Sequence, residues 1–445
     1  MQKRFGVYVS TLILALSFQT ASAQNPVVQV EEDVYSFKSP NNGSGPLWSF
    51  GCTSIVRTVD DVYVSQMETG DGVEPLCNTR WRLLRRDEGA WTTVAMADRF
   101  RQREPCSLAL TDDSTLNLYV NDSRAEPGTH YQECFPHVLR FSLAGPAPAM
   151  STIIPNWGQA TTYTDHSYRG YASDSNTGSL LMLNIDAATS KQHYALIDRD
   201  GVTQANGAIE FPIRAAYPQV ALAGNAVHVL AVGDIVEPNE TWRTYKAEQT
   251  GRSWDYVFRR LFYVVAPDLK TEGFSEPIEI ANRDSTAGHI RNQDLAIGSD
   301  GAAYLLYTAR ETQSALMRDK FFPDLSLVDS LHLVVVRHGE IVDRRVIVAG
   351  TESSQPTNAR FHKTPDGDLL VLIHLSGDEG GNKLVRLSPS EESTPILDVS
   401  FDPPFTSFML ATERAGNKPS NTIDVLGHRG RGDTLSYGRI TLKND

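Results

Sequence analysis

Apolar and polar residues alternate in short runs along nearly the whole chain, and Gly, Asp, Asn or Pro separates one run from the next. This two-residue period is typical of β-strands with one buried face. The three-to-four-residue period of amphipathic helices is scarce. The pattern therefore predicts an all-β protein.

One arrangement, an apolar strand, a tight polar turn and a second apolar strand, recurs along the chain. The clearest copy lies within residues 164–186, where a His-x-Tyr-Arg-Gly sequence precedes the first strand. The copies span residues 52–67, 106–121, 169–184, 217–233, 292–307, 359–374 and, more loosely, 405–428. Successive copies start 46 to 75 residues apart, which suits one four-stranded blade plus loops. Seven copies predict a seven-bladed β-propeller; a β-sandwich of unrelated hairpins is the alternative.

The remaining strands of the blades are expected from alternating apolar segments such as 81–94, 193–211, 258–280 and 331–347. Residues 27–37 and 434–443 also have strand patterns, at the two ends of the chain. Because an open sheet edge invites aggregation, we expect these two segments to pair and complete one shared blade. Residues 24–445 would then form a single propeller domain.

The N-terminus has the pattern of a secretory signal peptide. Lys3 and Arg4 precede an apolar run at residues 7–18, and Ala21-Ser22-Ala23 forms a small-residue cleavage site. Residues 1–23 are therefore a predicted signal peptide, cleaved after Ala23. No later segment approaches the roughly 20 apolar residues of a membrane span. The sequence predicts a secreted or periplasmic protein.

The formal net charge is −13, and removal of Lys3 and Arg4 would make it −15. Such acidity argues against nucleic acid or an anionic membrane as the partner, since both require a basic face. A local basic pocket for an acidic sugar remains compatible with it. The expected partner is a polysaccharide or oligosaccharide substrate, bound by a monomer.

The four cysteines all lie in the first third of the chain. In an oxidising compartment an even number predicts disulfides, and four cysteines allow three pairings. We expect Cys52 to pair with Cys77 and Cys106 with Cys134, each closing a loop within one repeat. A zinc site is the alternative, although no Cys-x-x-Cys pair occurs. No cofactor is predicted with certainty. A structural Ca²⁺ in or near the channel is left open, although no loop has a calcium-binding signature.

Two hairpins carry a family resemblance. The sequences SDGAAYLL at residues 299–306 and PDGDLLVL at residues 365–372 resemble the repeats of the BNR or sialidase-like propeller superfamily, which includes sialidases and propeller-shaped polysaccharide lyases such as ulvan lyases. The resemblance covers most of the mature chain and implies a carbohydrate-active protein. No complete Ser-x-Asp-x-Gly-x-x-Trp box is present, and no three-arginine carboxylate clamp is evident, so the resemblance favours a lyase over a sialidase.

The repeat also predicts where a site would lie. Residues before each first strand and after each second strand should share one face of the propeller. The residues before first strands are His166, Tyr168, Arg169, Arg214, Tyr217, His289, Arg291, Arg360 and His362. Those after second strands are Asp234, Glu237, Arg310, Arg318 and Asp319. The two long insertions, residues 234–256 and 308–329, would wall the same face.

These residue types suit an acidic sugar, because an arginine fork matches a carboxylate or sulfate. For a uronate lyase we expect Arg169 to neutralise the carboxylate, His166 to act as base and Tyr168 as acid. A glycosidase would instead use paired carboxylates, Asp234 with Glu237 or Asp319. A non-catalytic propeller that binds glycan or protein is the third reading.

Structural roles for the same residues stay open. His166 would then tether a loop, Tyr168 would fill the channel, and Arg169 would pair with Asp165 or Asp174 to brace a blade. The aromatic residues Trp242, Tyr245 and Trp254 of the first insertion would either stack on sugar rings or pin the insertion to the propeller. Nucleotide, zincin and esterase motifs are absent from the sequence.

Overall fold

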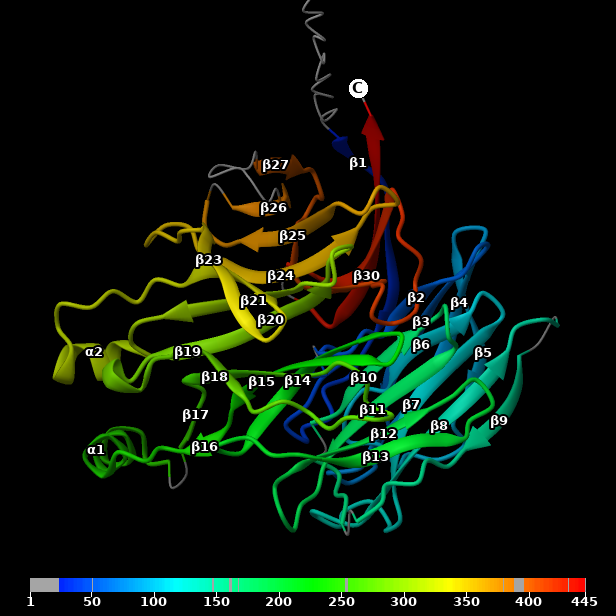
Figure 1. The fold of residues 1–445 in the computed structure, drawn as a ribbon, viewed down its shortest axis with the longest axis horizontal. Coiled ribbons are helices and arrows are strands. Elements are labelled where there is room, and N and C mark those ends of the chain that lie inside the picture. Colours follow the sequence, from blue (N-terminus) through cyan, green and yellow to red (C-terminus); the bar gives the residue numbers. More distant parts are fainter. Residues whose placement is uncertain are drawn as a thin grey trace, which may run out of the picture.

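A computed structural model describes residues 24–444 except 50, 146–147, 160–161, 167, 253–254, 379, 388–395 and 431. These residues form seven four-stranded antiparallel sheets around one axis (Figure 1). The predicted seven-bladed β-propeller is therefore confirmed. The predicted signal peptide, residues 1–23, lies outside the described residues.

The two inner strands of each blade are one copy of the sequence repeat, and the blades are numbered 1 to 7 in the order of these copies along the chain. They are β2 and β3 (Ile55–Arg57, Val62–Thr69), β6 and β7 (Ser107–Asp112, Thr115–Ser123), β10 and β11 (Gly170–Asp174, Ser179–Ile185), β14 and β15 (Ala215–Ala223, Ala226–Gly233), β20 and β21 (His289–Ile297, Ala303–Arg310), β24 and β25 (Pro356–Lys363, Leu369–Leu375), and β28 and β29 (Phe405–Leu410, Thr422–Arg429). The first strands of successive blades contact one another and line the axis.

The two outer strands come from the segments between repeats. They are β4 and β5 (Thr79–Asp87, Ala90–Met96), β8 and β9 (Cys134–Ser142, Ala149–Ile153), β12 and β13 (Gln192–Ile197, Thr203–Ile209), β18 and β19 (Arg260–Ala266, Ile278–Asn282), β22 and β23 (Ser330–Arg337, Glu340–Val348), β26 and β27 (Gly381–Arg386, Ile396–Val399), and β30 and β1 (Thr434–Asn444, Gln24–Ser36). The strands expected in segments 81–94, 193–211, 258–280 and 331–347 are all present.

The ring closes through its two chain ends. Strand β1 pairs antiparallel with β30, from Gln24 opposite Asn444 to Ser36 opposite Thr434. The N-terminal strand thereby becomes the outer strand of the C-terminal blade, as predicted. This closure covers the edge of β30 that would otherwise be open.

Burial explains why inner and outer strands differ in sequence. Every residue of β11 is buried, because neighbouring blades cover both faces of an inner strand. In β23, exposed residues alternate with partly buried ones, since an outer strand has one face in solvent. The inner strands therefore need nearly continuous apolar sequence, and the outer strands need alternation.

The loop between β28 and β29 blocks the central channel. Arg414 on this loop is buried, and its guanidinium donates to the carbonyl oxygens of Gly51 at 3.1 Å and Val220 at 3.0 Å. It also pairs with Asp294 on β20 at 2.5 Å. Ala415 adds a parallel bridge to Ser173 on β10. Side chains and backbone of several blades thus meet at a plug on the axis.

Two short helices project from one side of the ring (Figure 1). Helix α1 (Glu240–Thr250) lies between the short strands β16 (Ile235–Val236) and β17 (Tyr256–Val257), and α2 (Ala315–Phe321) lies between β21 and β22. Asn239 caps α1 by accepting from the Trp242 backbone at 3.1 Å, and Gly251 ends it with φ of 68°. Both helices follow second strands, so the two insertions wall the same face, as predicted. None of the described helices has the length and apolarity needed to cross a membrane.

The predicted disulfide pairing is wrong. All four cysteines are buried and present as free thiols. Cys134 contacts Cys77, and this hydrogen bond together with burial raises the pKa of the Cys134 thiol. Cys52 instead donates to the carbonyl oxygen of Arg169 at 3.3 Å. Cysteines of one repeat therefore face different neighbours, because adjacent blades bring together loops that are distant in sequence.

Candidate functional site

The face on which the first strands begin and the second strands end is called the entry face here. Just before β10, the imidazole Nε2 of His166 lies 2.5 Å from the phenol oxygen of Tyr168. Their rings meet edge to face with centroids 4.2 Å apart. Tyr168 adopts φ of 45°, a left-handed conformation that is costly for a residue with a side chain. The short contact and the edge-to-face packing of the two rings stabilise this arrangement, and the surrounding structure offsets the backbone strain at Tyr168.

Buried carboxyls flank this pair on both sides. The Oε1 atom of Glu104, just before β6, lies 3.4 Å from His166 Nδ1. Asp234, just after β15, forms a hydrogen bond with the Tyr168 hydroxyl. The two carboxyls are 2% and 1% exposed respectively. A carboxyl, an imidazole, a phenol and a second carboxyl thus follow one another across blades 2, 3 and 4.

Burial shifts the pKa values of two groups in this cluster, the Asp234 carboxyl and the Tyr168 phenol. Burial raises the pKa of Asp234, and the opposing effects of Arg214, the Tyr168 hydrogen bond and His166 offset only part of that increase. Burial also raises the pKa of the Tyr168 phenol, and the nearby Tyr217 and Asp234 raise it further. The phenol therefore stays protonated at neutral pH. The Arg214 guanidinium lies 5.1 Å from the Tyr168 ring centroid and 3.3 Å from Asp234 Oδ2, with its side chain 24% exposed.

Arg169 does not belong to the accessible part of this cluster. Its side chain is 1% exposed, and its guanidinium donates to the carbonyl oxygens of Tyr119 at 2.9 Å and Pro105 at 2.7 Å. Its Nε atom lies 3.8 Å from Glu104 Oε2. The expectation that Arg169 binds a substrate carboxylate is therefore corrected: it braces blades 2 and 3. It pairs with neither Asp165, which binds Arg103 at 3.0 Å, nor Asp174.

A row of aromatic rings continues the cluster along the entry face. The Tyr217 ring lies 4.8 Å from that of Tyr168 and 6.0 Å from that of Phe258, and the His289 ring is 6.0 Å from Phe258. Trp48 covers the start of the row, 6.3 Å from His166 and 5.8 Å from Tyr217. Trp48, Tyr217, Phe258 and His289 are each partly exposed in this row, whereas the Tyr168 ring is buried.

Blade 5 supplies basic residues at the far end of this row. The side chain of Arg291 is exposed, and Arg310 at the end of β21 lies 3.8 Å from Asp329. Burial, followed by the nearby Arg291, Arg310 and Arg259, lowers the pKa of His289 to about 3. Two guanidiniums therefore face one carboxylate, and this end of the row favours anions.

Most residues of the two insertions that were predicted to bind substrate instead form contacts that hold the insertions in place. Glu237 is fully buried and binds Arg259 at 2.5 Å and Lys246 at 2.9 Å. Burial acts to raise the pKa of Glu237, but those two hydrogen bonds outweigh it and the net pKa is lowered. Glu237 is thus a structural anchor of α1 rather than a substrate ligand, which corrects its prediction and removes it from the carboxylate pair of a glycosidase.

Aromatic contacts join the two helices. The Trp242 ring lies 5.6 Å from that of Phe322 and 5.2 Å from the Arg259 guanidinium, and Tyr245 lies 5.3 Å from Phe321. Trp242 and Tyr245 therefore pin the insertions together instead of offering free stacking faces. Trp254 lies outside the described residues.

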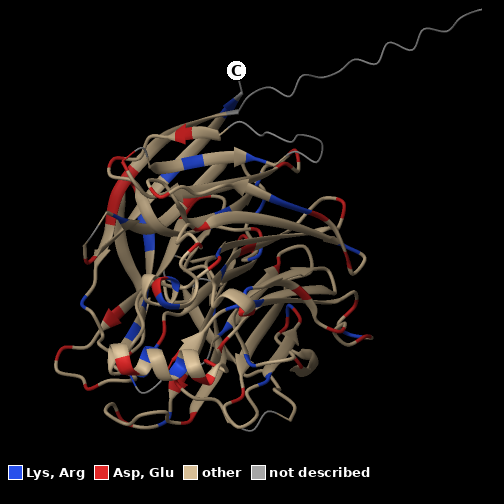
Figure 2. Cartoon of the chain, turned by 90° about the vertical axis from the view of Figure 1, so that its left-hand side faces the viewer, with Lys and Arg blue, Asp and Glu red and all other residues tan. Residues whose placement is uncertain are grey.

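Arg318 and Asp319 pair with each other on α2 at 2.8 Å. Their roles as substrate ligands stay predictions, as does that of Asp319 as a glycosidase carboxylate. Figure 2 faces the side that carries the helices, and residues of both charge signs are mixed over it.

Arg360 and His362 lie away from the entry face, contrary to prediction. Strand β24 begins at Pro356, so Arg360 sits in its middle and His362 near its far end. Arg360 is buried, and its guanidinium binds the carbonyl oxygens of Gln293 and Phe408. Burial lowers the pKa of Arg360 to about 10. His362 faces the Ser420 carbonyl oxygen at 2.6 Å, and both residues are structural.

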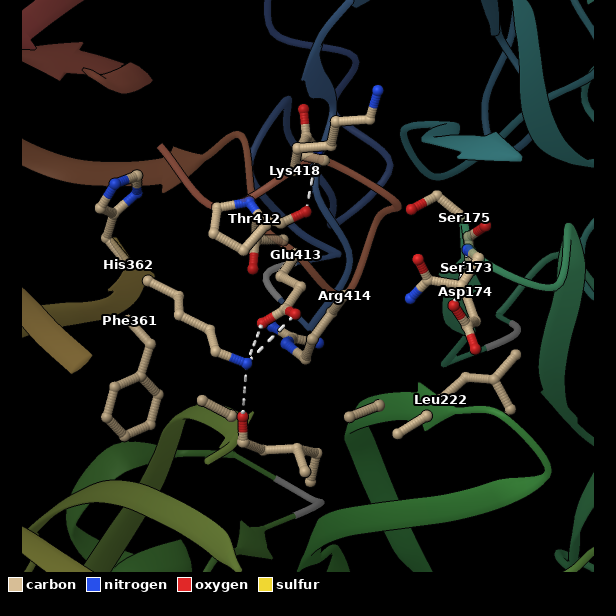
Figure 3. A pocket seen from close by; sticks show the side chains of 18 of the residues that line it. Ser173, Asp174, Ser175, Leu222, Phe361, His362, Thr412, Glu413, Arg414 and Lys418 are labelled. Atoms are coloured by element: carbon tan, nitrogen blue, oxygen red, sulfur yellow. Dashed lines mark hydrogen bonds and ion pairs between the residues drawn. The ribbon is translucent and has the colours of Figure 1, made fainter. Parts of the chain in front are cut away.

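A cavity of about 780 Å³ opens at the opposite face of the propeller (Figure 3). The turns after the first strands and the plug loop line it, with Asp174, Phe361, His362, Glu413 and Arg414 among the lining residues. Lys363 bridges Glu413 at 3.1 Å and the Ile297 carbonyl oxygen at 3.3 Å. The charged groups of this cavity are largely paired, and the plug separates it from the His166 cluster.

Among the described residues, no three His, Cys, Asp or Glu side chains are grouped to hold a metal ion. Two members of the site, Glu104 and Trp48, were missed at the sequence level. Glu104 stands just before the second repeat, so the rule that selected His166 for the third repeat would have selected Glu104. Trp48 lies further from the start of the first repeat in the sequence, so the same rule would not have selected it.

Comparison with solved structures places this fold beside propeller lyases. An ulvan lyase of polysaccharide lyase family PL25, solved with -[GlcA(1-4)Rha3S]- bound, matches with a TM-score of 0.57 at 10% identity, over 93% of this chain and 95% of that one. The polysaccharide lyase Uly1 matches with a TM-score of 0.56 at 9% identity, over 95% of this chain and all of that one. At such identities the likeness establishes the propeller fold and not the narrower BNR or sialidase-like assignment. No family model and no curated protein sequence matches the chain.

Proposed function

We propose that this protein is a polysaccharide lyase that cleaves a uronate-containing glycan by β-elimination at the entry face. The observation that carries the proposal is the 2.5 Å contact between His166 Nε2 and the Tyr168 hydroxyl, with Arg214 beside it. Elimination needs a base, an acid and a cation for the carboxylate, and these three groups lie together. The fold similarity to propeller polysaccharide lyases supports the same class.

In this mechanism Arg214 replaces Arg169 as the group that neutralises the uronate carboxylate. A guanidinium beside the carboxylate stabilises the negative charge that develops when the C5 proton leaves. Arg214 is partly exposed, whereas Arg169 is enclosed by backbone carbonyl groups. Arg291 and Arg310 would hold a second acidic group of the polymer further along the aromatic row.

The proton transfers balance within the pair. The C5–H bond breaks and its proton passes to Nε2 of His166, while its electron pair forms the C4=C5 double bond. The C4–O bond breaks, and the leaving oxygen takes the hydroxyl proton of Tyr168. The resulting imidazolium and phenolate then exchange one proton across their 2.5 Å contact, which returns both residues to their starting states.

The decisive experiment incubates purified mature protein with a panel of uronic-acid polysaccharides and follows both new reducing ends and the ultraviolet absorbance of the unsaturated uronate. Reducing ends with the chromophore support the proposal. Reducing ends without it would identify a glycoside hydrolase, and glycan binding without cleavage would identify a binding propeller. Either result overturns the elimination mechanism.

Variants assign the activity to the site. His166→Ala and Tyr168→Phe should each lower the rate on the order of 10²–10⁴-fold, the usual worth of a general base or acid. His130 and Tyr131, an exposed pair with ring centroids 6.4 Å apart outside the cluster, provide the matched control. Activity that survives His166→Ala combined with Tyr168→Phe would place the chemistry elsewhere.

We also propose that the protein works outside the cytoplasm. The predicted signal peptide ends at Ala23, and the ring-closing strand β1 starts at Gln24, so cleavage there would leave the shared blade complete. Fractionation of the producing cells and N-terminal sequencing test this, and a chain that keeps residues 1–23 and stays in the cytoplasm would contradict it.

A further inference from the structure

A groove of about 480 Å³ lies between blades 4 and 5, and none of its lining residues belongs to the His166–Tyr168 cluster. Strand β19 and Arg283, which follows it, line the groove from blade 4, and Tyr307, His332 and Arg344 line it from strands β21, β22 and β23 of blade 5. Its volume falls within the usual range of small-molecule sites. The groove is therefore large enough to hold a sugar unit of a polymer.

A stacked pair of rings brings the two arginines of the groove together. Tyr307 and His332 lie opposite each other on β21 and β22, with ring centroids 4.8 Å apart and planes 6° apart. The Tyr307 phenol accepts a hydrogen bond from Arg344. Burial, followed by the nearby Arg283 and Arg344, lowers the pKa of His332 to about 4. The imidazole is thus neutral at neutral pH, and the positive charge of the groove comes from the two guanidiniums.

Neither guanidinium has a carboxylate partner among the residues that the structure describes. The Nη1 atom of Arg283 donates to the carbonyl oxygen of Asn282 at 3.1 Å, and Nη1 of Arg344 donates to that of Ile280 across the groove. The Nε atom of Arg283 is buried without a hydrogen-bond partner. Because a guanidinium has five N–H donors, both side chains keep donors for a ligand.

The carboxylates around the groove are bound to other cations. Glu279 accepts from Nε of Arg260 at 2.5 Å, and Asp284 lies 4.0 Å from the same nitrogen. Asp343 pairs with Arg345 at 3.3 Å. The charges of the two groove guanidiniums therefore remain uncompensated by protein groups. An oxyanion between them would accept from both planar forks.

The groove begins where the aromatic row of the entry face ends. The last ring of that row belongs to His289, and a Cβ added at the preceding Gly288 would lie 2.7 Å from Cβ of Arg283. The backbone nitrogen of Arg283 also donates to the carbonyl oxygen of Arg259 at 2.9 Å, next to Phe258 of the row. A polymer that leaves the row at His289 would therefore meet the groove next.

We propose that Arg283 and Arg344 form a separate anion site, the rim site, which binds a sulfate or carboxylate group of an acidic glycan away from the bond that is cleaved. Sulfate and carboxylate share the oxygen acceptors that a guanidinium fork recognises. The rim site holds the chain and takes no part in the proton transfers. The identity of the chain rests on the proposed lyase function, whereas binding of an anion between the two arginines requires no catalysis.

NMR of histidine-labelled protein tests the rim site without substrate. Inorganic sulfate or acetate is added against sodium chloride of equal ionic strength, and the His332 signals are assigned by their loss in His332→Gln. A saturable shift is expected, together with a rise in the His332 pKa, because a bound anion compensates the two neighbouring cations. A response to one anion alone identifies which group of the glycan the site takes, and no saturable response to either anion overturns the proposal.

Arginine variants assign that binding to the groove. Arg283→Gln and Arg344→Gln should each weaken binding of the responding anion about tenfold or more, since each removes one charged fork. Arg337→Gln is the matched control, because Arg337 lies at the opposite end of β22 and pairs with Asp300. Arg344 also bridges the two blades through Ile280, so Arg283→Gln gives a test that leaves this bridge in place. Equal affinity in all three variants overturns the proposal.

Kinetics on glycans of different length separates the rim site from the proposed lyase function. Arg283→Gln should raise KM several-fold on a long acidic polymer with kcat unchanged, and should leave KM unchanged on the shortest oligosaccharide that is cleaved. Equal effects on both lengths would overturn a distal binding role. A protein that binds the anion beside His332 but cleaves no uronate polysaccharide keeps the rim site and refutes the lyase function. Cleavage without any anion response at His332 does the reverse.

Discussion

The imidazole Nε2 of His166 lies 2.5 Å from the phenol oxygen of Tyr168, and each ring faces a buried carboxyl from a different blade. The propeller brings these four groups together because its first strands all begin on one face around a common axis. The plug at Arg414 closes that axis, so substrate can approach the cluster only from the entry face.

Arg214 should be the residue that neutralises the carboxylate of the uronate substrate. Arg214→Gln is expected to lower kcat/KM about 10²–10³-fold on an active uronate polysaccharide, because it removes one preorganised charge at the reacting sugar. Arg214→Lys keeps the charge but loses the planar fork, and should recover part of the activity. Steady-state kinetics checks this order, and equal activity of Arg214→Gln and the parent protein would assign neutralisation to another residue.

Arg291 should bind the polymer away from the reacting atoms. Its side chain is exposed on blade 5 at the end of the aromatic row. Arg291→Gln is therefore expected to raise KM several-fold with kcat nearly unchanged, the signature of lost ground-state binding. The effect should shrink at high ionic strength, since salt screens exposed charges. A loss confined to kcat would instead place Arg291 at the reaction centre.

His228 should make the protein less stable in acid. It is 7% exposed, lies 2.6 Å from the Tyr263 hydroxyl, and burial lowers its pKa to about 4. The unfolded imidazole titrates near 6.5, so between pH 6.5 and 4 the unfolded state binds more protons and stability falls with pH. The loss from this residue is on the order of 3 kcal/mol. Above pH 6.5 it contributes no pH dependence.

Urea unfolding of His228→Gln at several pH values measures this contribution. The variant should be less stable than the parent at pH 8, because Tyr263 loses its partner. The difference should narrow steadily from pH 6.5 to pH 4. A difference that stays constant across that range would mean that His228 does not titrate on unfolding.

Gly416 should be required by the plug. It adopts φ of 80°, and a Cβ added there would overlap the carbonyl oxygen of Leu110. Gly301 is the matched control, because it has φ of 76° with nothing within 4 Å of an added Cβ. Gly301→Ala should cost only the left-handed backbone penalty of about 1–2 kcal/mol, and Gly416→Ala clearly more. Equal melting temperatures for the two variants would show that the plug adjusts freely.

Oxidation should join Cys77 to Cys134. These thiols contact each other, whereas Cys52 and Cys106 lie beside Arg169. Disulfide formation requires two thiols within bonding reach, and the contact between Cys77 and Cys134 supplies that geometry. Peptide mapping after treatment with a disulfide oxidant should find this one linkage, and Cys134→Ser should abolish it. A linkage between Cys52 and Cys77 would contradict the observed blade packing.

Much of the architecture could be predicted because short stretches of sequence determine it. Alternation in a strand reports which faces are buried, and a turn joins the two strands of a hairpin, so each repeat can be recognised from about 16 consecutive residues of sequence. The shared blade of β1 and β30 followed from the requirement to close the ring. The location of His166, Tyr168, Arg214 and Asp234 on one face followed from the direction of the strands.

Errors arose where the strand boundary or the neighbouring blade decided the outcome. The repeats were aligned by their apolar cores, but β24 begins three residues before the aligned copy, and this shift moves His362 to the opposite end of its strand. Arginine is the residue type expected to bind a carboxylate, yet the Arg169 side chain is enclosed by carbonyl groups of blade 2. Neither effect leaves a trace in the nearby sequence.

By itself, the sequence determined the propeller, its seven blades and the face that holds the candidate site, because periodicity and turn positions are properties of short segments. Only the tertiary structure decided which charged groups meet there. Glu104 reaches His166 across 62 residues of chain, and burial by neighbouring blades raises the pKa of Asp234. Contacts between blades and the loss of solvent are properties of the assembled ring, so the chemistry of the site emerges only when the blades have packed.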